Sequence, residues 1–442
     1  MFTSLYLPIG VPTFDQDAAR AVYDASLAAL RDCDANVLAP ESPLLSSAKV
    51  AEFVQGKQAD LVVLQNATFA NGQYTAEVLR QLDCPVLLWT PEEPASDGRL
   101  KLNALTGAFS AGNMLTSFGR PFVYVYGSAD DASTKRSLAA VYAAAKVRVA
   151  LKALRVLQIG YTPEGFGFGR ASDSDVMRTF GSQLISIEAR ELIDRANQYS
   201  DEDAAEYLVD AKERIRALDT IEEKNVLAFT RLYKAYDTYV KENGIGALSS
   251  RCWPDFFTAY GTPVCAVLAM LNDRGIPAAC ETDTYGALSM FVAAEMTGKP
   301  AFFGDPVALH KDENSVTFWH CGTAACSLAR EDTGACAGVH CNRKIGPTLE
   351  FGCQPEKEVT VLRIGRDGEG KFRILTARGE ALDKPKQYYG TSVVVKLEHN
   401  AEDFVKQAVA YGWEPHFAVA MGDISEAVAD LGKFLGIEVF GF

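Results

Sequence analysis

Three residues with chemically active side chains each stand at the end of a short apolar run that is typical of a β-strand. They are Glu281, Asp305 and His320, and a helix-length segment, 285–296, lies between the first two runs. This order is that of a β-α-β crossover, which places successive strand ends side by side on one edge of a parallel sheet. In open α/β sheets that edge holds the ligand crevice. Two carboxylates and an imidazole there predict a divalent-metal or proton-transfer site.

A second acid, Asp283, lies two positions after Glu281. A strand that ends in two acids with one residue between them indicates metal ligands. Taken singly, each acid is also typical of a helix cap or a solvated loop, and Asp283 is well placed to cap the next helix. Asp305 precedes Pro306 and would equally suit a turn. Oxygen ligands with one imidazole favour Mn²⁺ or Mg²⁺ over the Zn²⁺ that thiolates prefer.

The histidines and cysteines leave alternatives open. His416 lies between Pro415 and an apolar strand, where it is either a functional residue or a satisfied core residue, and His320 has the same two interpretations. A cysteine-rich stretch contains Cys321, Cys326, Cys336, His340 and Cys341. It raises the question of a structural zinc, but the spacings lack two tight C-x2-C knuckles, which favours free thiols.

The length of 442 residues exceeds what one hydrophobic core supports, so we expect two or three domains. The net charge of −14 argues against a nucleic-acid partner, because such binders need basic surfaces. No apolar stretch has membrane-spanning length, and the N-terminus lacks the features of a signal peptide. We therefore expect a cytoplasmic protein without membrane association.

An N-terminal α/β domain is predicted for residues 1–152, because strand and helix signals alternate there. The expected strands are 4–9, 61–66, 85–89 and 122–126, and the expected helices are 16–31, 73–82 and 135–151. This pattern predicts a doubly wound parallel sheet. The first strand is not followed by a G-x-G-x-x-G motif, so the sequence lacks a dinucleotide-binding fingerprint.

A second Rossmann-like α/β domain is predicted for residues 153–328, and it carries the acids. It begins with a strand at 155–160 and continues with helical stretches at 185–197, 203–243 and 264–271. Gly275 is the expected C-cap of the last helix.

A β-rich, barrel-like domain that contributes His416 is predicted for residues 329–442. Its alternating or β-branched runs at 359–364, 371–375 and 392–397 are typical of antiparallel hairpins. The chain then returns to α/β, with helices at 402–410 and 424–435 and strands at 416–420 and 437–440.

Two further segments are candidates for the ligand crevice. Residues 165–169, rich in glycine and phenylalanine, would either close over a ligand or form a flexible connection. The candidates for substrate binding in the second segment are Arg251, Trp253 and Asp255. Arg251 would suit an anionic substituent through forked hydrogen bonds, and the alternative is a structural ion pair.

Several motifs together resemble one enzyme group. They are Gly261-Thr262-Pro263, Met270, Gly275, Glu281-x-Asp283, Asp305 24 positions after Glu281, the segment from Pro415 to Asp423, and the part from Gly160 to Gly181. In these the chain resembles the L-fucose isomerase and L-arabinose isomerase group of metal-dependent ketol isomerases. Sulfoquinovose isomerases resemble this group too.

The resemblance implies a metal held by Glu281, Asp305 and His416, namely Mn²⁺ with Mg²⁺ or Co²⁺ as alternatives. It also implies that Glu281 and Asp305 exchange protons with the substrate. His320 matches a metal-binding histidine of arabinose isomerases, where fucose isomerases carry asparagine, so it binds either metal or substrate. We assign substrate binding to His320, Arg251, Trp253, Asp255 and Asp283. The resemblance further implies a homo-trimer or hexamer with active sites at subunit boundaries.

The expected function is that of an aldose–ketose isomerase acting on an unphosphorylated aldose such as L-fucose, L-arabinose or sulfoquinovose. Such a reaction moves a proton between C2 and C1 through an enediol, which needs a base, an acid and a polarising cation. The chain is shorter than typical fucose isomerases between Asp305 and His416, so its pocket walls can differ. The alternatives are a non-catalytic sugar-binding or sensor protein and a metal-dependent aldolase or lyase.

Overall fold

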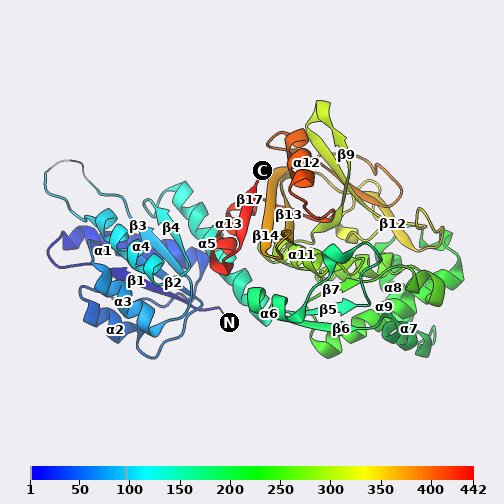
Figure 1. The fold of residues 1–442 in the computed structure, drawn as a ribbon, viewed down its shortest axis with the longest axis horizontal. Helices are drawn as coiled ribbons and strands as arrows, with labels where there is room; N and C mark the ends of the chain where they lie inside the picture. The colour runs from blue at the N-terminus through cyan, green and yellow to red at the C-terminus, as the bar shows by residue number, and fades with distance from the viewer. Residues whose placement is uncertain (1, 95, 97) are drawn as a thin grey trace. The chain divides into compact units, whose positions relative to one another are not determined.

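The computed structural model describes residues 2–94, 96 and 98–442, and the chain forms two compact units (Figure 1). The first comprises Met1–Ala150 with Glu426–Ile437, and the second comprises Leu151–Ser425 with Glu438–Phe442. The last helix therefore belongs to the first unit, while the last strand belongs to the second. The three-domain boundaries after residues 152 and 328 stay predictions. Within the described ranges, no helix is both long and apolar enough to cross a bilayer.

The first unit contains a sheet of four parallel strands in the order β1-β2-β3-β4. These strands are β1 (Ser4–Ile9), β2 (Leu61–Asn66), β3 (Val86–Thr90) and β4 (Phe122–Tyr126). The helices are α1 (Gln16–Cys33), α2 (Ser47–Val54), α3 (Gly72–Gln81), α4 (Ala104–Ser117), α5 (Ala132–Ala153) and α13 (Ser425–Leu435). The first three strands are buried along their full length, which is why they read as continuous apolar runs.

The second unit begins with another sheet of four parallel strands, in the order β6-β5-β7-β8. They are β5 (Arg155–Ile159), β6 (Gln183–Ile187), β7 (Ala247–Ser250) and β8 (Ala278–Cys280). The helices are α6 (Asp173–Phe180), α7 (Ala189–Gln198), α8 (Ala205–Arg214), α9 (Glu223–Asn243), α10 (Cys265–Asp273) and α11 (Thr284–Thr297). Gly275 follows α10 with a φ of 77°, the left-handed conformation expected of a glycine that ends a helix.

Two predicted helices of this region are wrong in their extent. The stretch 185–197 begins as strand β6, because Ile185 and Ile187 pair with β5. The stretch 203–243 is interrupted between α8 and α9, where the Arg216 backbone N–H donates to the Ala335 carbonyl at 2.8 Å. Both deviations arise from partners distant in sequence, which override local helix propensity.

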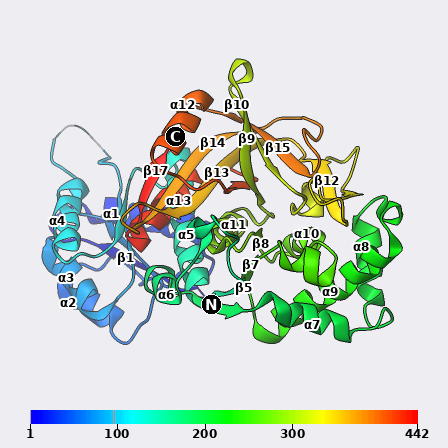
Figure 2. The same cartoon turned by 45° about the vertical axis from the view of Figure 1, so that its right-hand side comes forward.

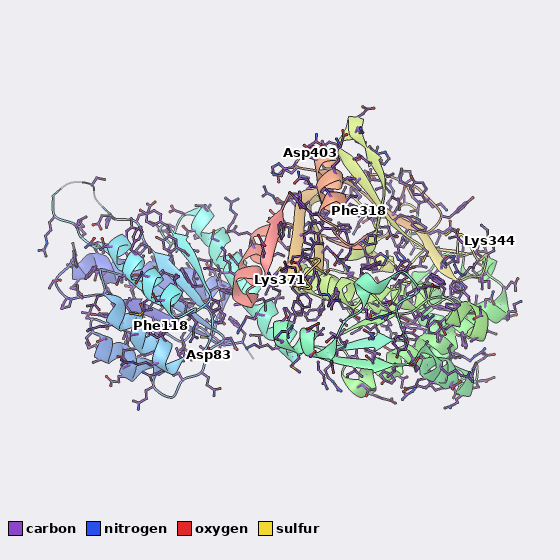
Figure 3. The ribbon with its side chains drawn as sticks, viewed as in Figure 1. Asp83, Phe118, Phe318, Lys344, Lys371 and Asp403 are labelled. Carbon is purple, nitrogen blue, oxygen red and sulfur yellow. The ribbon has the colours of Figure 1, made fainter. Side chains whose placement is uncertain are left out.

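The remaining strands form a closed antiparallel barrel in the circular order β15-β10-β9-β16-β13-β14, in which β14 pairs with β15. Its members are β9 (Phe302–His310), β10 (Ser315–His320), β13 (Glu356–Arg366), β14 (Phe372–Ala381), β15 (Thr391–Leu397) and β16 (Phe417–Ala420). Strands β11 (Cys336–Gly338), β12 (Thr348–Gly352) and β17 (Glu438–Gly441) extend this sheet, and α12 (Ala401–Ala410) precedes β16. Phe318 on β10, labelled in Figure 3, is fully buried against Phe417. The predicted fold class is confirmed.

The predicted crossover that joins the strand before Glu281 to the strand before Asp305 is wrong. Strand β8 ends the parallel sheet, whereas β9 pairs antiparallel with β10 and β16 in the barrel. Asp305 therefore lies inside a strand, not beyond its end. An apolar run shows that a strand is buried, but it does not reveal which sheet completes its hydrogen bonds.

Helix α11 lies between the parallel sheet and the barrel, as Figure 2 shows. It contacts β7 and β8 on one side and β13 and β16 on the other. All residues from Thr284 to Ala293 are buried, which explains why this helix is apolar on every face. Its first turn, and the acids before it, are thereby fixed against barrel strands.

Closure of the barrel predicts that a side chain at Gly379, where β14 pairs with both β13 and β15, will destabilise the protein. A Cβ there would lie 2.3 Å from the Lys396 carbonyl oxygen, which is backbone and cannot yield. We expect Gly379→Ala to lower the free energy of unfolding by about 2 kcal/mol in urea titrations. Gly368→Ala is the matched control, because a Cβ at Gly368 meets nothing within 4 Å. Equal stability of the two variants would contradict the assigned pairing.

Candidate metal and proton-transfer site

Three side chains from distant parts of the second unit converge on one point. Glu281 comes from the turn after β8, Asp305 from β9 and His416 from the residue before β16. The Nε2 atom of His416 lies 3.0 Å from Glu281 Oε2 and 3.4 Å from Asp305 Oδ1. The three residues that the sequence proposed as metal ligands are thus neighbours in space.

The His416 ring is oriented from its other side. Its Nδ1 lies 2.9 Å from Asp283 Oδ2, while Nε2 makes no well-aligned hydrogen bond with any described residue. Burial lowers the pKa of His416, but the carboxylates of Asp283 and Glu281 outweigh it and raise that pKa to about 10. A divalent cation can take the place of the Nε2 proton, because a carboxylate on the far nitrogen is the usual support of a metal-binding histidine.

The spacing and chemistry of these atoms fit such a cation. Neighbouring ligand atoms of an octahedral ion with bonds of about 2.1 Å lie about 3 Å apart, close to the distances around His416 Nε2. Two carboxylates with one imidazole are also a donor set that suits Mn²⁺ or Mg²⁺.

Asp283 is the centre of a buried charge network. Its oxygens lie 2.5 and 3.2 Å from the Arg363 guanidinium, and both residues are 0% exposed. Burial alone would raise the pKa of Asp283, but the charges of Arg363 and His416 hold it well below its ordinary range. Asp283 also accepts from the Gly286 backbone N–H at 2.9 Å, which confirms the predicted helix cap. With both oxygens engaged, the geometry favours a positioning role for Asp283 over substrate binding.

The turn that carries Glu281 is strained. Glu281 and Thr282 are consecutive non-glycine residues with φ values of 58° and 57°, in the left-handed region. Each such residue costs on the order of 1–2 kcal/mol. Hydrogen bonds from Thr282 Oγ1 to the carbonyls of Ile159 and Tyr161 hold the turn. No residue pattern indicated this conformation, which aims the Glu281 carboxylate at His416.

His320 joins the cluster from the end of β10. Ligand atoms of His320, Glu281 and His416 lie within 4.8 Å of one another. Burial lowers the pKa of His320, but neighbouring Cys321 and Asp305 raise it to about 9. Burial also raises the pKa of Asp305 above its ordinary value. The position of His320 suits either of the two roles that the sequence left open.

The sulfur atoms that gather beside the site come from Cys321 of the cysteine-rich stretch and from two cysteines outside that stretch. Cys321 Sγ lies 3.7 Å from Cys265 Sγ and 3.4 Å from His320 Nδ1. Thiol hydrogen bonds from Cys265 and Cys280 lower the pKa of Cys321. All ten cysteines are free. Only tertiary structure brings Cys265 and Cys280 to Cys321.

Of the three residues proposed around Arg251, one contacts the site and the other two pair with each other. Trp253 reaches the site, with its Nε1 3.4 Å from Glu281 Oε1. Arg251 Nε lies 2.8 Å from Asp255 Oδ2 and donates to the Trp253 carbonyl at 3.2 Å. Of the two interpretations of Arg251, the structure therefore supports the structural ion pair.

Aromatic rings surround His416. The ring centroids of Phe303, Phe168 and Phe166 lie 4.9, 5.3 and 6.3 Å from that of His416. A Cβ on Gly169 would lie 2.8 Å from Asp283 Cα, so the glycine allows the segment 165–169 to approach. This segment thus covers the site, where it would exclude water.

A solvent-open cavity of about 680 Å³ lies beside Asp305. Val307 is two residues further along β9, and Trp319 is the cross-strand partner of Asp305. The lining residues are Val307, Trp319, Cys341, Lys386, Gln387, Tyr388 and Tyr389. Its volume is within the range of small-molecule sites.

Sequence reasoning missed Arg363, which orients the site through Asp283. A signal was present, because Arg363 is the lone charged residue of the apolar run 359–364. A charge within a buried strand requires a buried partner.

Known proteins match the chain over almost its full length. Residues 320–442 match the profile of the L-fucose isomerase C-terminal domain. A sulfoquinovose isomerase from Clostridium sp. (strain MSTE9) is 51% identical over 435 residues, which cover 98% of this chain and 97% of the relative. Sulfoquinovose isomerases from Priestia aryabhattai and Alkalicoccus urumqiensis are 34% and 33% identical, with coverage of 99% of this chain and 98% and 99% of the relatives.

The charge network predicts a large effect of Asp283→Asn on stability. This substitution keeps the shape but leaves the buried Arg363 charge without its partner, so we expect a loss of about 3–5 kcal/mol in urea unfolding. Replacing both residues, as Asp283→Asn with Arg363→Met, is expected to recover part of that loss. Glu295→Gln, at an exposed position of α11, is the control. An Asp283→Asn protein as stable as the parent would contradict the network.

Proposed function

The chain belongs to the sulfoquinovose isomerase family, which shares the L-fucose isomerase C-terminal domain, and on this premise we propose that it is a metal-dependent aldose–ketose isomerase acting on sulfoquinovose. The observation that carries the chemistry is the convergence of Glu281 and Asp305 on His416 Nε2. The proposed substrate is supported by the full-length relatives, which are sulfoquinovose isomerases. The predicted trimer or hexamer, and its cytoplasmic location, are retained in this proposal.

The cation would be held by Glu281, Asp305 and His416, with His320 adjacent. We propose that this cation is Mn²⁺, with Mg²⁺ or Co²⁺ as alternatives. When bound, such an ion polarises the sugar carbonyl and stabilises the negative charge of the enediolate.

The carboxylates would divide the proton transfers. We propose Asp305 as the group that exchanges protons with the sugar oxygens, since the reaction needs one group there and another at the carbon-bound proton. Glu281 would then be the base that moves the proton between C2 and C1. Asp283 and Arg363 would fix the His416 ring, and the rings of Phe166 and Phe168 would limit the access of water. Trp253, which contacts Glu281, would help to place the sugar.

We expect Glu281→Gln to lower isomerisation at least about 10³-fold, because an amide cannot accept the C2 proton. The assay follows exchange of that proton with solvent deuterium, and Glu295→Gln, at an exposed position of α11, is the matched control. Retained exchange in Glu281→Gln would remove this residue from the mechanism.

The substrate and metal are tested in the parent protein. Sulfoquinovose, L-fucose and L-arabinose are offered with Mn²⁺ and again after chelation, and the products are identified by mass. We expect a ketose of unchanged mass from sulfoquinovose and a loss of activity on chelation. Shorter products would indicate an aldolase or lyase, and sugar binding without turnover would indicate a binding protein.

Metal binding is expected to release about one proton near pH 8, because the metal-free His416 has a pKa of about 10. The affinity for Mn²⁺ should therefore rise as the pH increases from 6 to 8, by up to about tenfold per unit. Calorimetry in two buffers of different ionisation enthalpy measures the released proton. The exposed His399→Asn change serves as control. Binding that is independent of pH would contradict this ligand assignment.

A further inference from the structure

The cationic side chains near the site differ in whether an acid neutralises them. Arg251 pairs with Asp255, Arg363 with Asp283, and Lys386 with Glu350. Arg343 is different, since it forms neither an ion pair nor a hydrogen bond with any residue in the part of the chain that the structure describes. Its positive charge is thus available to a ligand.

The Arg343 guanidinium is held by aromatic rings. Its central carbon lies 5.2 Å from the centre of the Trp253 ring and 5.0 Å from that of Phe257. Contacts of this kind orient an arginine through its flat face and leave the N–H groups at its edge free to donate. Arg343 is nevertheless exposed, so an anion can reach it.

The same tryptophan connects Arg343 to the reacting groups. The Trp253 indole N–H approaches Glu281 Oε1 at 3.4 Å, while its ring contacts Arg343. One indole therefore separates the free cation from the carboxylate that we propose as base. The loop that carries Arg343 also contributes Cys341 to the cavity beside Asp305, and its neighbour Lys344 is labelled in Figure 3.

We propose that Arg343 binds the sulfonate group of the substrate, an inference that rests on the proposed function. A sulfonate remains anionic at every pH that the protein tolerates and offers three acceptor oxygens. It therefore requires N–H donors and a positive charge, which the guanidinium fork supplies. In sulfoquinovose the sulfonate is on C6, at the opposite end of the sugar from C1 and C2. A cation set apart from Glu281 by one indole matches that separation.

This assignment replaces Arg251 as the residue that recognises an anionic substituent. The Arg251 guanidinium is already engaged by Asp255 and by the Trp253 carbonyl. A sulfonate bound there would lie beside the Asp255 carboxylate, which already neutralises Arg251 and would repel a second anion. Arg170, which follows the segment 165–169, donates to Thr162 at 3.3 Å and is the competing candidate.

The test compares sulfoquinovose with quinovose, the same aldose without the sulfonate. For Arg343→Gln we expect kcat/KM for sulfoquinovose to fall roughly 10- to 100-fold, mainly through KM, with quinovose turnover unchanged within about threefold. Arg343→Lys keeps the charge but loses the fork, so an intermediate loss is expected. Arg190→Gln is the matched control, because Arg190 forms its ion pair with Asp194 on the surface of α7. Competitive inhibition by propanesulfonate should weaken in parallel in Arg343→Gln.

Three results would overturn the inference, and the first is an unchanged ratio of sulfoquinovose to quinovose turnover in Arg343→Gln, with unchanged inhibition by propanesulfonate. The second is a selective loss in Arg170→Gln that Arg343→Gln does not share. The third is a loss for both sugars in Arg343→Gln, because it would show a general role in the site. Failure of the proposed function looks different, since the parent protein itself would then not isomerise sulfoquinovose.

Discussion

A fully buried ion pair between Arg363 and Asp283 is the interaction on which the site depends. Removing two charges from water costs several kcal/mol per ion, and only close pairing with additional hydrogen bonds offsets that cost. Asp283 meets this condition with Arg363, His416 and the first turn of α11. Glu414 lies 3.7 Å from Arg363 Nε and supplies a second negative charge. The network thereby fixes the His416 ring, which no flexible surface contact could do.

Helix α11 gives this network its rigidity. Because one side packs on the parallel sheet and the other on the barrel, the helix cannot rotate or shift without exposing apolar surface on both sides. The same packing sustains the left-handed turn at Glu281 and Thr282, whose strain must be balanced by surrounding contacts. Burial of the apolar residues of α11 therefore fixes the positions of Glu281 and Asp283, which come just before this helix.

Charge compensation separates structural groups from groups that can meet a ligand. Arg251, Arg363 and Asp283 are all paired within the protein, and they set the shape of the site. Glu281 and Asp305 face one another across His416, where a cation would balance them. Arg343 carries the opposite charge, and no acid in the described part of the chain pairs with it. An acidic centre flanked by an unpaired arginine suits a substrate whose reacting carbons and anionic substituent lie at opposite ends.

The sequence by itself indicated which side chains could do chemistry and which segments are buried strands or helices. Glu281, Asp305 and His416 could be proposed from their positions after or before apolar runs and from resemblance, and the cap at Asp283 from its place before α11. Parallel sheets could be expected from alternating strands and helices. These features are local, because periodicity and capping depend on neighbours within a few residues.

Tertiary structure alone decided how those residues meet. Strand β9 joins the barrel through β10, which follows it directly, and through β16, which lies more than a hundred residues away, so the expected crossover failed although its strands exist. The same reason hid the partner of Arg363 and left the two interpretations of Arg251 open. A charged side chain is structural or free according to whether an acid from another element neutralises it, and that partner is set by packing rather than by adjacent sequence.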